Sequence, residues 1–208
     1  MENVNTAQKT ARIEALTDGV YAIIMTLLAF DIRLPEVELS GISQALASLG
    51  STLVTYVISF ALLGVYWTGH RNQFNYIERI DQTLRWISIF FLGVSALIPF
   101  TAEMLSRYPL SSLPIMLYGV NLIVIGLLLF WHWSYATGRG KLVADDLAKE
   151  VIYIGKERSL FAVVCYLAAI ALAFFVPVLS LIIYALVPLF YIFPKLWSFI
   201  PSRASNGK

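Results

Sequence analysis

The residues best suited to chemistry are the two histidines of the chain and a pair of acidic residues in its first apolar segment. No HExxH pattern, Cys/His cluster, GxSxG motif or phosphate-binding loop occurs, so His70 and His132 do not indicate a metal site or an enzyme. Glu14 and Asp18 stand one helical turn apart and repel each other unless a cation joins them, and Arg12 is close in sequence. Such a group can be a functional site or a structural tie. We predict an inter-helix polar network of Arg12, Thr17, Asp18 and His70.

Composition places these residues in a membrane. The chain has 208 residues, is 59% hydrophobic and 13% charged, and has a mean hydropathy of +0.75. A soluble domain has about 25% charged residues, so this chain has too few charges to cover a soluble surface. Its single cysteine excludes a disulfide scaffold, and its formal charge of +2 is too small to indicate nucleic acid as a partner. We therefore expect an all-α integral membrane protein.

The charged residues are confined to short islands, and the apolar segments between them predict six transmembrane helices. A helix needs about 20 apolar residues to cross about 30 Å of hydrocarbon. The first segment reaches this length only with polar ends, which suits a helix that faces protein or water. A turn is expected at residues 177–180, and a short interfacial helix within residues 137–157. The single domain, residues 1–208, has predicted spans of approximately 13–33, 43–70, 82–106, 110–136, 158–177 and 180–200.

The distribution of cations sets the orientation of these spans. With six spans and both termini in the cytoplasm, only Arg33 and Arg107 of the 15 Lys and Arg residues fall outside. This asymmetry follows the positive-inside rule, and a five-span arrangement would spoil it. The tryptophans near the ends of the spans are expected to form an interfacial belt; they are Trp67, Trp86, Trp131, Trp133 and Trp197.

The first helix has two distinct faces. At 100° per residue, Gly19, Thr26, Leu27 and Phe30 all lie within about 60° of Ile23. Asp18 lies about 140° away, so the polar network points away from this stripe. A stripe of this kind usually faces lipid or a packed core, and its periodicity does not by itself indicate a pore.

The order of these residues resembles the TMEM175 family of potassium channels, in its bacterial form with a single six-helix repeat. The family begins its first helix with Arg-x-x-x-Phe-Ser-Asp, and Arg12, Leu16, Thr17 and Asp18 occupy these places here. The similarity is good over roughly residues 10–102, whereas the last three helices match in number and hydrophobicity only. Three further matches are Trp67-x-x-His70, Asp81-x-x-Leu84-x-Trp86 and Ile98-Pro99-Phe100.

The resemblance implies four subunits around one axis, with the pore on that axis lined by the first helix. The TVGYG filter is absent, as it is in the family, so selectivity would come from a hydrophobic constriction and side-chain polarity. By position, Ile23 would form the constriction, with Thr26 and Phe30 toward the outside and Leu27 beside them. Four Thr26 hydroxyls could replace part of the hydration of an ion.

An acidic outer mouth is also expected. Asp31, Glu36 and Glu38 follow the first helix, and in a tetramer they would give twelve carboxylates that concentrate cations. Solvated loop acids are an equally good interpretation of these three residues.

The resulting hypothesis is a homotetrameric channel for monovalent cations, with potassium preferred, in the bilayer of a bacterial inner membrane. No cofactor is expected besides potassium as the permeant ion. One alternative is a proton-coupled secondary transporter that uses Asp18 and His70. A membrane-embedded enzyme or scaffold is another, although clusters of catalytic residues are missing.

Overall fold

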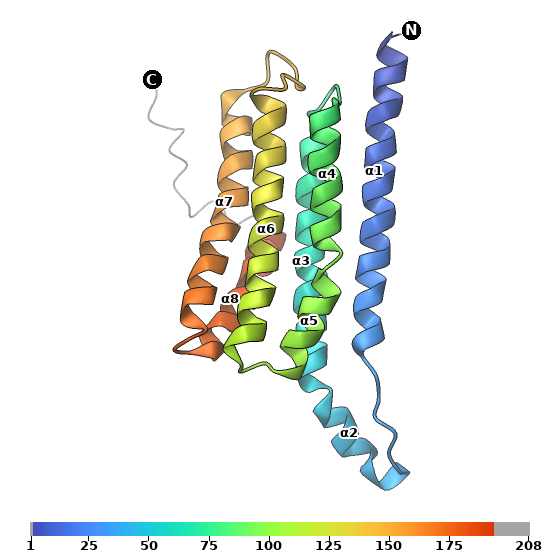
Figure 1. Cartoon of the computed structure of the whole chain (residues 1–208), viewed down its shortest axis with the longest axis vertical. Helices are drawn as coiled ribbons and strands as arrows, with labels where there is room; N and C mark the ends of the chain where they lie inside the picture. The colour runs from blue at the N-terminus through green and yellow to red at the C-terminus, as the bar shows by residue number, and fades with distance from the viewer. Residues whose placement is uncertain (1, 194–208) are drawn as a thin grey trace.

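The protein is an elongated bundle of helices with α1 at one edge and α7 and α8 at the other (Figure 1). The computed structural model describes the backbone of residues 2–193 and the side chains of residues 10–38 and 40–193. Within this range the expected all-α architecture is confirmed, with one isolated bridge between Ile77 and Val143. The α-helices are α1 (Glu2–Leu27), α2 (Ile42–Ser48), α3 (Gly50–Phe74), α4 (Gln82–Ser95), α5 (Ile98–Arg107), α6 (Ser112–Thr137), α7 (Lys149–Leu172) and α8 (Pro177–Ile192).

The first three predicted spans differ from the helices in their boundaries. The first continues as the short 3-10 helix η1 (Leu28–Asp31) and leaves the helical conformation at Ile32. The second is divided at Leu49 into α2 and α3, after the 3-10 helix η2 (Leu39–Gly41). The third is broken between α4 and α5, because Pro99 has no N–H for the Ser95 carbonyl and its ring would clash with that carbonyl.

The second half of the chain matches the predicted spans more closely at α6 than at α7 and α8. No separate interfacial helix forms within residues 137–157, because α7 already begins at Lys149 and continues to Leu172. The turn expected at residues 177–180 lies before Pro177, which occupies the first turn of α8, where its missing N–H costs nothing. Residues 194–200 of the sixth predicted span, with Trp197, lie outside the described residues.

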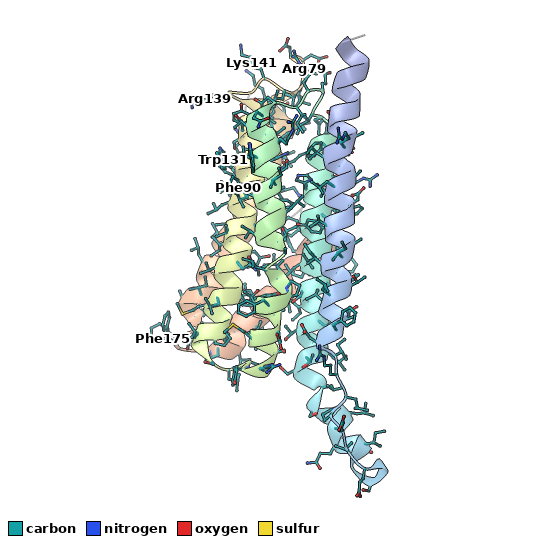
Figure 2. The ribbon with its side chains drawn as sticks, turned by 45° about the vertical axis from the view of Figure 1, so that its right-hand side comes forward. Arg79, Phe90, Trp131, Arg139, Lys141 and Phe175 are labelled. Carbon is teal, nitrogen blue, oxygen red and sulfur yellow. The ribbon has the colours of Figure 1, made fainter. Side chains whose placement is uncertain are left out.

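Among the residues that the structure describes, four helical stretches are long and apolar enough to cross a membrane: Thr10–Asp31, Gly50–Phe74, Gln82–Arg107 and Ser112–Thr137. The charged residues in the first half of α7 keep it out of this set, and α8 is apolar but has only 16 residues. Arg79, Arg139 and Lys141 gather at the end of the bundle where α1 begins, and Phe175 lies at the opposite end (Figure 2). The apolar middle and the basic end are those of a multi-pass membrane protein.

Close backbone contact holds α6 against α7 and α8. A Cβ at Gly119 would lie 2.3 Å from the hydroxyl of Tyr184, and one at Gly126 would lie 2.9 Å from a methyl of Val163. Small residues permit this approach in helices that pack in a membrane. These helices pack in turn against α3 and α4, and α1 packs on α3 and α4.

Candidate functional site

One face of α1 packs against the bundle and the opposite face is left open. The buried residues recur at helical spacing, on a helix that packs against α3 and α4; they are Ile13, Thr17, Tyr21, Ile24 and, at the start of η1, Leu28. On the other side Ile23 is 60% exposed and Phe30 is 65% exposed. We call this second side the open face of α1; it consists of Gly19, Ile23, Thr26, Leu27 and Phe30. Within the described protomer, therefore, the predicted stripe is covered by no other helix.

The change to a 3-10 helix keeps the open face continuous. Phe30 follows Leu27 by three residues, and residues three apart are eclipsed in a 3-10 helix. Gly19 is also open, since a Cβ there would meet nothing within 4 Å. The four residues predicted to line the pore, with Ile23 as its constriction, thus lie along one surface; they are Ile23, Thr26, Leu27 and Phe30.

The hydroxyl of Thr26 is oriented by the helix itself. Its Oγ1 donates to the carbonyl of Ile23 at 2.8 Å. Because this bond uses the only hydroxyl proton, the oxygen retains its lone pairs for an acceptor role. An exposed hydroxyl oxygen of this kind is a suitable neutral ligand for a partly dehydrated cation.

The polar network between α1 and α3 differs from the predicted one. Asp18 accepts a hydrogen bond from Nε1 of Trp67 at 2.7 Å, so a tryptophan on α3 makes this tie instead of His70. Thr17 is buried but donates to the Ile13 carbonyl of its own helix, and Arg12 is exposed. Trp67 was expected in the interfacial belt, and its position near a span end does not distinguish the two roles.

His70 lies in an aromatic cluster behind α1. Its ring stacks on Phe91 at 4.9 Å between centroids, and the ring of His132 is also 4.9 Å away. Nδ1 of His132 lies 2.6 Å from Oε1 of Gln73, whose Nε2 donates to the Leu129 carbonyl. Oε1 of Gln73 must therefore accept a hydrogen bond from Nδ1–H of His132. Within the described residues, both histidines are core residues and no hydrogen bond joins His70 to Asp18.

A second hydrogen bond between helices fixes the rotation of α1, and no pattern in the sequence indicated it. The hydroxyls of Tyr21 and Ser95 lie 2.9 Å apart and join α1 to the end of α4. Tyr21 also stacks on Phe91 at 5.8 Å. The buried spacing of Ile13, Thr17 and Tyr21 could have indicated the packed face, but not the partner on α4. This tie holds Ile23 on the side that faces away from the bundle.

The acidic residues lie beyond the far end of α1. Asp31 ends η1 and is half-buried, while Glu36 and Glu38 are exposed in the segment that follows. Arg33 is nearby, and its Nε donates to the Phe30 carbonyl at 3.0 Å. Glu103 and Arg107 on α5 form an exposed ion pair at the same end. Throughout the described residues, no group of three or more His, Cys, Asp or Glu could hold a metal ion.

Comparison with protein families and curated proteins gives two matches that bear on this site. A family model described as endosomal/lysosomal potassium channel TMEM175 matches residues 12–99, which include α1 from Arg12 onward and all of α3 and α4. A potassium channel of Streptomyces collinus is 28% identical over 188 residues, covering 88% of this chain and 91% of the relative.

A solved structure supports the same relationship. The crystal structure of a lysosomal potassium-selective channel TMEM175 homolog from Chamaesiphon minutus has a TM-score of 0.78 and 26% sequence identity. The superposed region covers 89% of this chain and 97% of the Chamaesiphon minutus chain. A chicken protein named endosomal/lysosomal proton channel TMEM175 is 25% identical over 96% of this chain, which spans 41% of that longer relative.

Proposed function

Because this chain belongs to the TMEM175 family, we propose that it is a potassium-permeable cation channel whose pore is lined by α1. The observation that carries the proposal is the open face of α1. Ile23, Thr26 and Phe30 are exposed on one line, on a helix whose opposite face is buried. Four copies of this face around an axis would enclose a narrow path with an apolar ring and a ring of hydroxyls.

In this arrangement Ile23 forms the constriction and Thr26 lies beside it toward the acidic end. A narrow ring of four isoleucines resists wetting and can hold the path closed. The oxygens of Thr26 accept a cation without a charged side chain, so selectivity between monovalent cations would be moderate. Leu27 and Phe30 extend the apolar lining toward Asp31, Glu36 and Glu38.

We further propose six membrane spans with both termini in the cytoplasm. The spans would be α1 with η1, α3, the broken pair α4 and α5, α6, α7 and α8. The basic end of the bundle in Figure 2 supports this orientation, because cytoplasmic loops are enriched in Lys and Arg. Of the cations assigned to that side, Lys195, Arg203 and Lys208 lie outside the described residues.

A flux assay on liposomes that contain the purified protein tests the function. We expect potassium uptake that exceeds sodium uptake, excludes N-methylglucamine and does not saturate, from a complex with the mass of four chains. The proton-coupled transporter predicts saturable flux that requires a pH gradient. Absence of flux for every cation across a range of pH, or a complex of another size, would contradict the proposed pore.

A further inference from the structure

The break between α4 and α5 lies beside a buried asparagine of α6. In an unbroken helix the N–H of Ile98 would donate to the carbonyl of Val94, four residues earlier. Here the N–H of Leu97 donates to that carbonyl at 3.1 Å, so the chain tightens before α5 begins. Asn121 is 7% exposed and contacts the break from α6. Buried backbone groups at such a break need partners from neighbouring helices.

The side-chain amide of Asn121 replaces the interrupted helical hydrogen bond. Its Nδ2 lies 3.0 Å from the carbonyl oxygen of Val94, and its Oδ1 lies 3.3 Å from the backbone nitrogen of Ile98. These partners fix the orientation of the amide, because a carbonyl can only accept a hydrogen bond and an N–H can only donate one. One side chain of α6 thus satisfies both backbone groups that the break separates.

The end of α4 that Asn121 holds is also the end that contacts α1. Ser95 follows Val94, and its Oγ donates to the Phe91 carbonyl at 2.7 Å. Because this bond uses the only hydroxyl proton of Ser95, the hydroxyl of Tyr21 must be the donor in the 2.9 Å contact between the two side chains. A shift of the last turn of α4 would therefore move the acceptor that Tyr21 uses.

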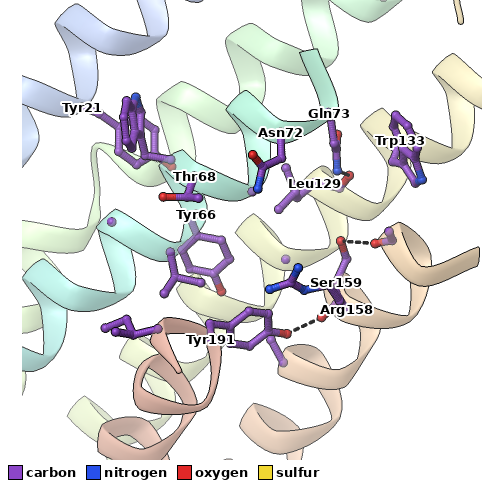
Figure 3. Close-up of a pocket in the computed structure, with 18 of the residues that line it drawn as sticks. Tyr21, Tyr66, Thr68, Asn72, Gln73, Leu129, Trp133, Arg158, Ser159 and Tyr191 are labelled. Atoms are coloured by element: carbon purple, nitrogen blue, oxygen red, sulfur yellow. Dashed lines mark hydrogen bonds between the residues drawn. The ribbon is translucent and has the colours of Figure 1, made fainter. Parts of the chain in front are cut away.

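Tyr21 in turn sets the direction of the open face of α1. It precedes Ile23 by two residues, or about 200° around the helix, so an inward Tyr21 leaves Ile23 on the outward side. Tyr21 also borders a groove along α3 (Figure 3), but neither Ser95 nor Asn121 lines that groove or lies on α1. Asn121 can therefore affect the proposed pore only through the residues between them.

We propose that Asn121 is a positioning residue for α1. It fixes the bend between α4 and α5, and this bend fixes the rotation of α1 through Ser95 and Tyr21. The effect on ion selectivity rests on the proposed pore, whereas the effect on the position of α1 does not, so the two are tested separately.

The position of α1 can be measured without ion flux. Cys165 is the single cysteine of the chain, so Cys165→Ala provides a background in which Ile24→Cys is the only thiol. Ile24 is 2% exposed, and its replacement should react slowly with a maleimide in the purified full-chain protein. Asn121→Leu removes the amide and keeps a similar volume. We expect it to raise the labelling rate severalfold, because the end of α4 is no longer held.

Two hydroxyl deletions separate positioning from a general loss of stability. Tyr21→Phe removes the donor to Ser95 and should raise the labelling rate as Asn121→Leu does, with little further increase in the double variant. Tyr118→Phe is the matched control on α6, because the hydroxyl of Tyr118 lies 2.8 Å from that of Ser59 on α3, and this bond involves neither α4 nor α5. This control also loses a buried hydrogen bond, but its labelling rate should stay at the wild-type value.

Thr101→Val is a milder test of the same amide and keeps the experiment decisive if Asn121→Leu does not fold. The Oγ1 of Thr101 lies 3.3 Å from Oδ1 of Asn121, and valine removes this contact at similar volume. It should raise the labelling rate less than Asn121→Leu does. Wild-type labelling in both variants, or an equal rise in Tyr118→Phe, would overturn the proposal.

Reversal potentials in planar bilayers test the consequence for selectivity. We expect Asn121→Leu to change the permeability ratio of potassium to sodium in the same direction as Tyr21→Phe, and Tyr118→Phe to match wild type. An unchanged ratio in Asn121→Leu, together with unchanged labelling, would contradict the positioning role. Absence of ion flux in the wild-type protein would instead contradict the proposed pore, and the labelling rates would still decide the role of Asn121.

Discussion

Ile23 and Ile24 are consecutive residues of α1 with opposite surroundings. Ile23 is 60% exposed on the open face, whereas Ile24 is 2% exposed and packs in the core. We expect Ile23→Asn to raise potassium flux several-fold or to lower the preference for potassium, because an amide wets the proposed constriction. Assembly should survive, since exposed substitutions change stability by only about 0.5 kcal/mol. Liposome flux and size-exclusion chromatography measure the two effects.

Ile24→Asn is the matched control for this substitution. An amide at the buried position creates a cavity and leaves polar atoms without partners, which costs about 3–5 kcal/mol. The yield of folded protein should therefore fall for Ile24→Asn and not for Ile23→Asn. If Ile23→Asn reduced the folded fraction and left flux per channel unchanged, the open face would be a packing surface and not a pore.

The side chain of Thr26 allows the role of the hydroxyl to be separated from the role of size. Thr26→Val replaces the hydroxyl with a methyl group of similar volume, and Thr26→Ser keeps the oxygen. We expect Thr26→Val to reduce the permeability ratio of potassium to sodium by about fivefold, the effect of losing roughly 1 kcal/mol of ion coordination. Thr26→Ser should stay close to wild type. Reversal potentials in planar bilayers with potassium and sodium on opposite sides measure this ratio, and equal ratios for both variants would exclude the hydroxyl as an ion ligand.

At the scale of the element, the orientation of α1 depends on the hydrogen bond between Asp18 and Trp67. Asp18→Ala removes the acceptor of this hydrogen bond and Trp67→Phe removes its donor. Each substitution should therefore lower the free energy of unfolding by the same contribution of about 1–2 kcal/mol, which can be lost only once. We expect each single variant to lower the thermal stability of the assembled protein and the double variant to lower it little further. Asp18→Asn, which keeps an acceptor oxygen, should retain more stability than Asp18→Ala. Additive losses in the double variant would show that the two residues act separately.

The sequence predicts continuous helices better than their interruptions. The span predicted at residues 110–136 corresponds to Ser112–Thr137, because an uncharged apolar run of this length fits a single membrane-spanning helix. The break between α4 and α5 was not predicted, since a proline within an apolar run can bend a helix or divide it. The start of α7 was also missed, because five of its first ten residues are charged and this stretch does not differ from a loop in hydropathy.

The sequence predicts which residues share the open face of α1, but not the hydrogen-bond partners of its polar residues. Helical periodicity places Ile23, Thr26, Leu27 and Phe30 on one face, and this depends only on the 3.6-residue repeat. The partners of Asp18 and His70 depend instead on how neighbouring helices are rotated. That rotation is set by contacts such as Tyr21 with Ser95, which are 74 residues apart in sequence and have no periodic signal.

At the scale of the whole molecule, the two ends of the bundle carry different charges, and this difference should affect conduction. Asp31, Glu36 and Glu38 lie beyond the end of α1, and fourfold repetition would place twelve carboxylates around the proposed outer mouth. We expect replacement of all three by Asn, Gln and Gln to lower potassium conductance severalfold at 10 mM salt. At 1 M salt the variant should match wild type, because the Debye length falls from about 30 Å to about 3 Å.

The control for this prediction lies at the opposite end of the bundle. Asp145 and Asp146 are exposed in the loop between α6 and α7, so Asp145→Asn with Asp146→Asn removes acidic charge far from the outer mouth. Single-channel recordings with low salt on one side at a time separate the two ends. A loss of conductance that persists at 1 M salt would indicate that the triple variant has altered the pore itself, and equal losses for the triple variant and the control would show that net charge, not the mouth, is responsible. A loss confined to the triple variant, to low salt and to one side would place the carboxylates at the entrance, because a local potential acts only on ions within its screening distance.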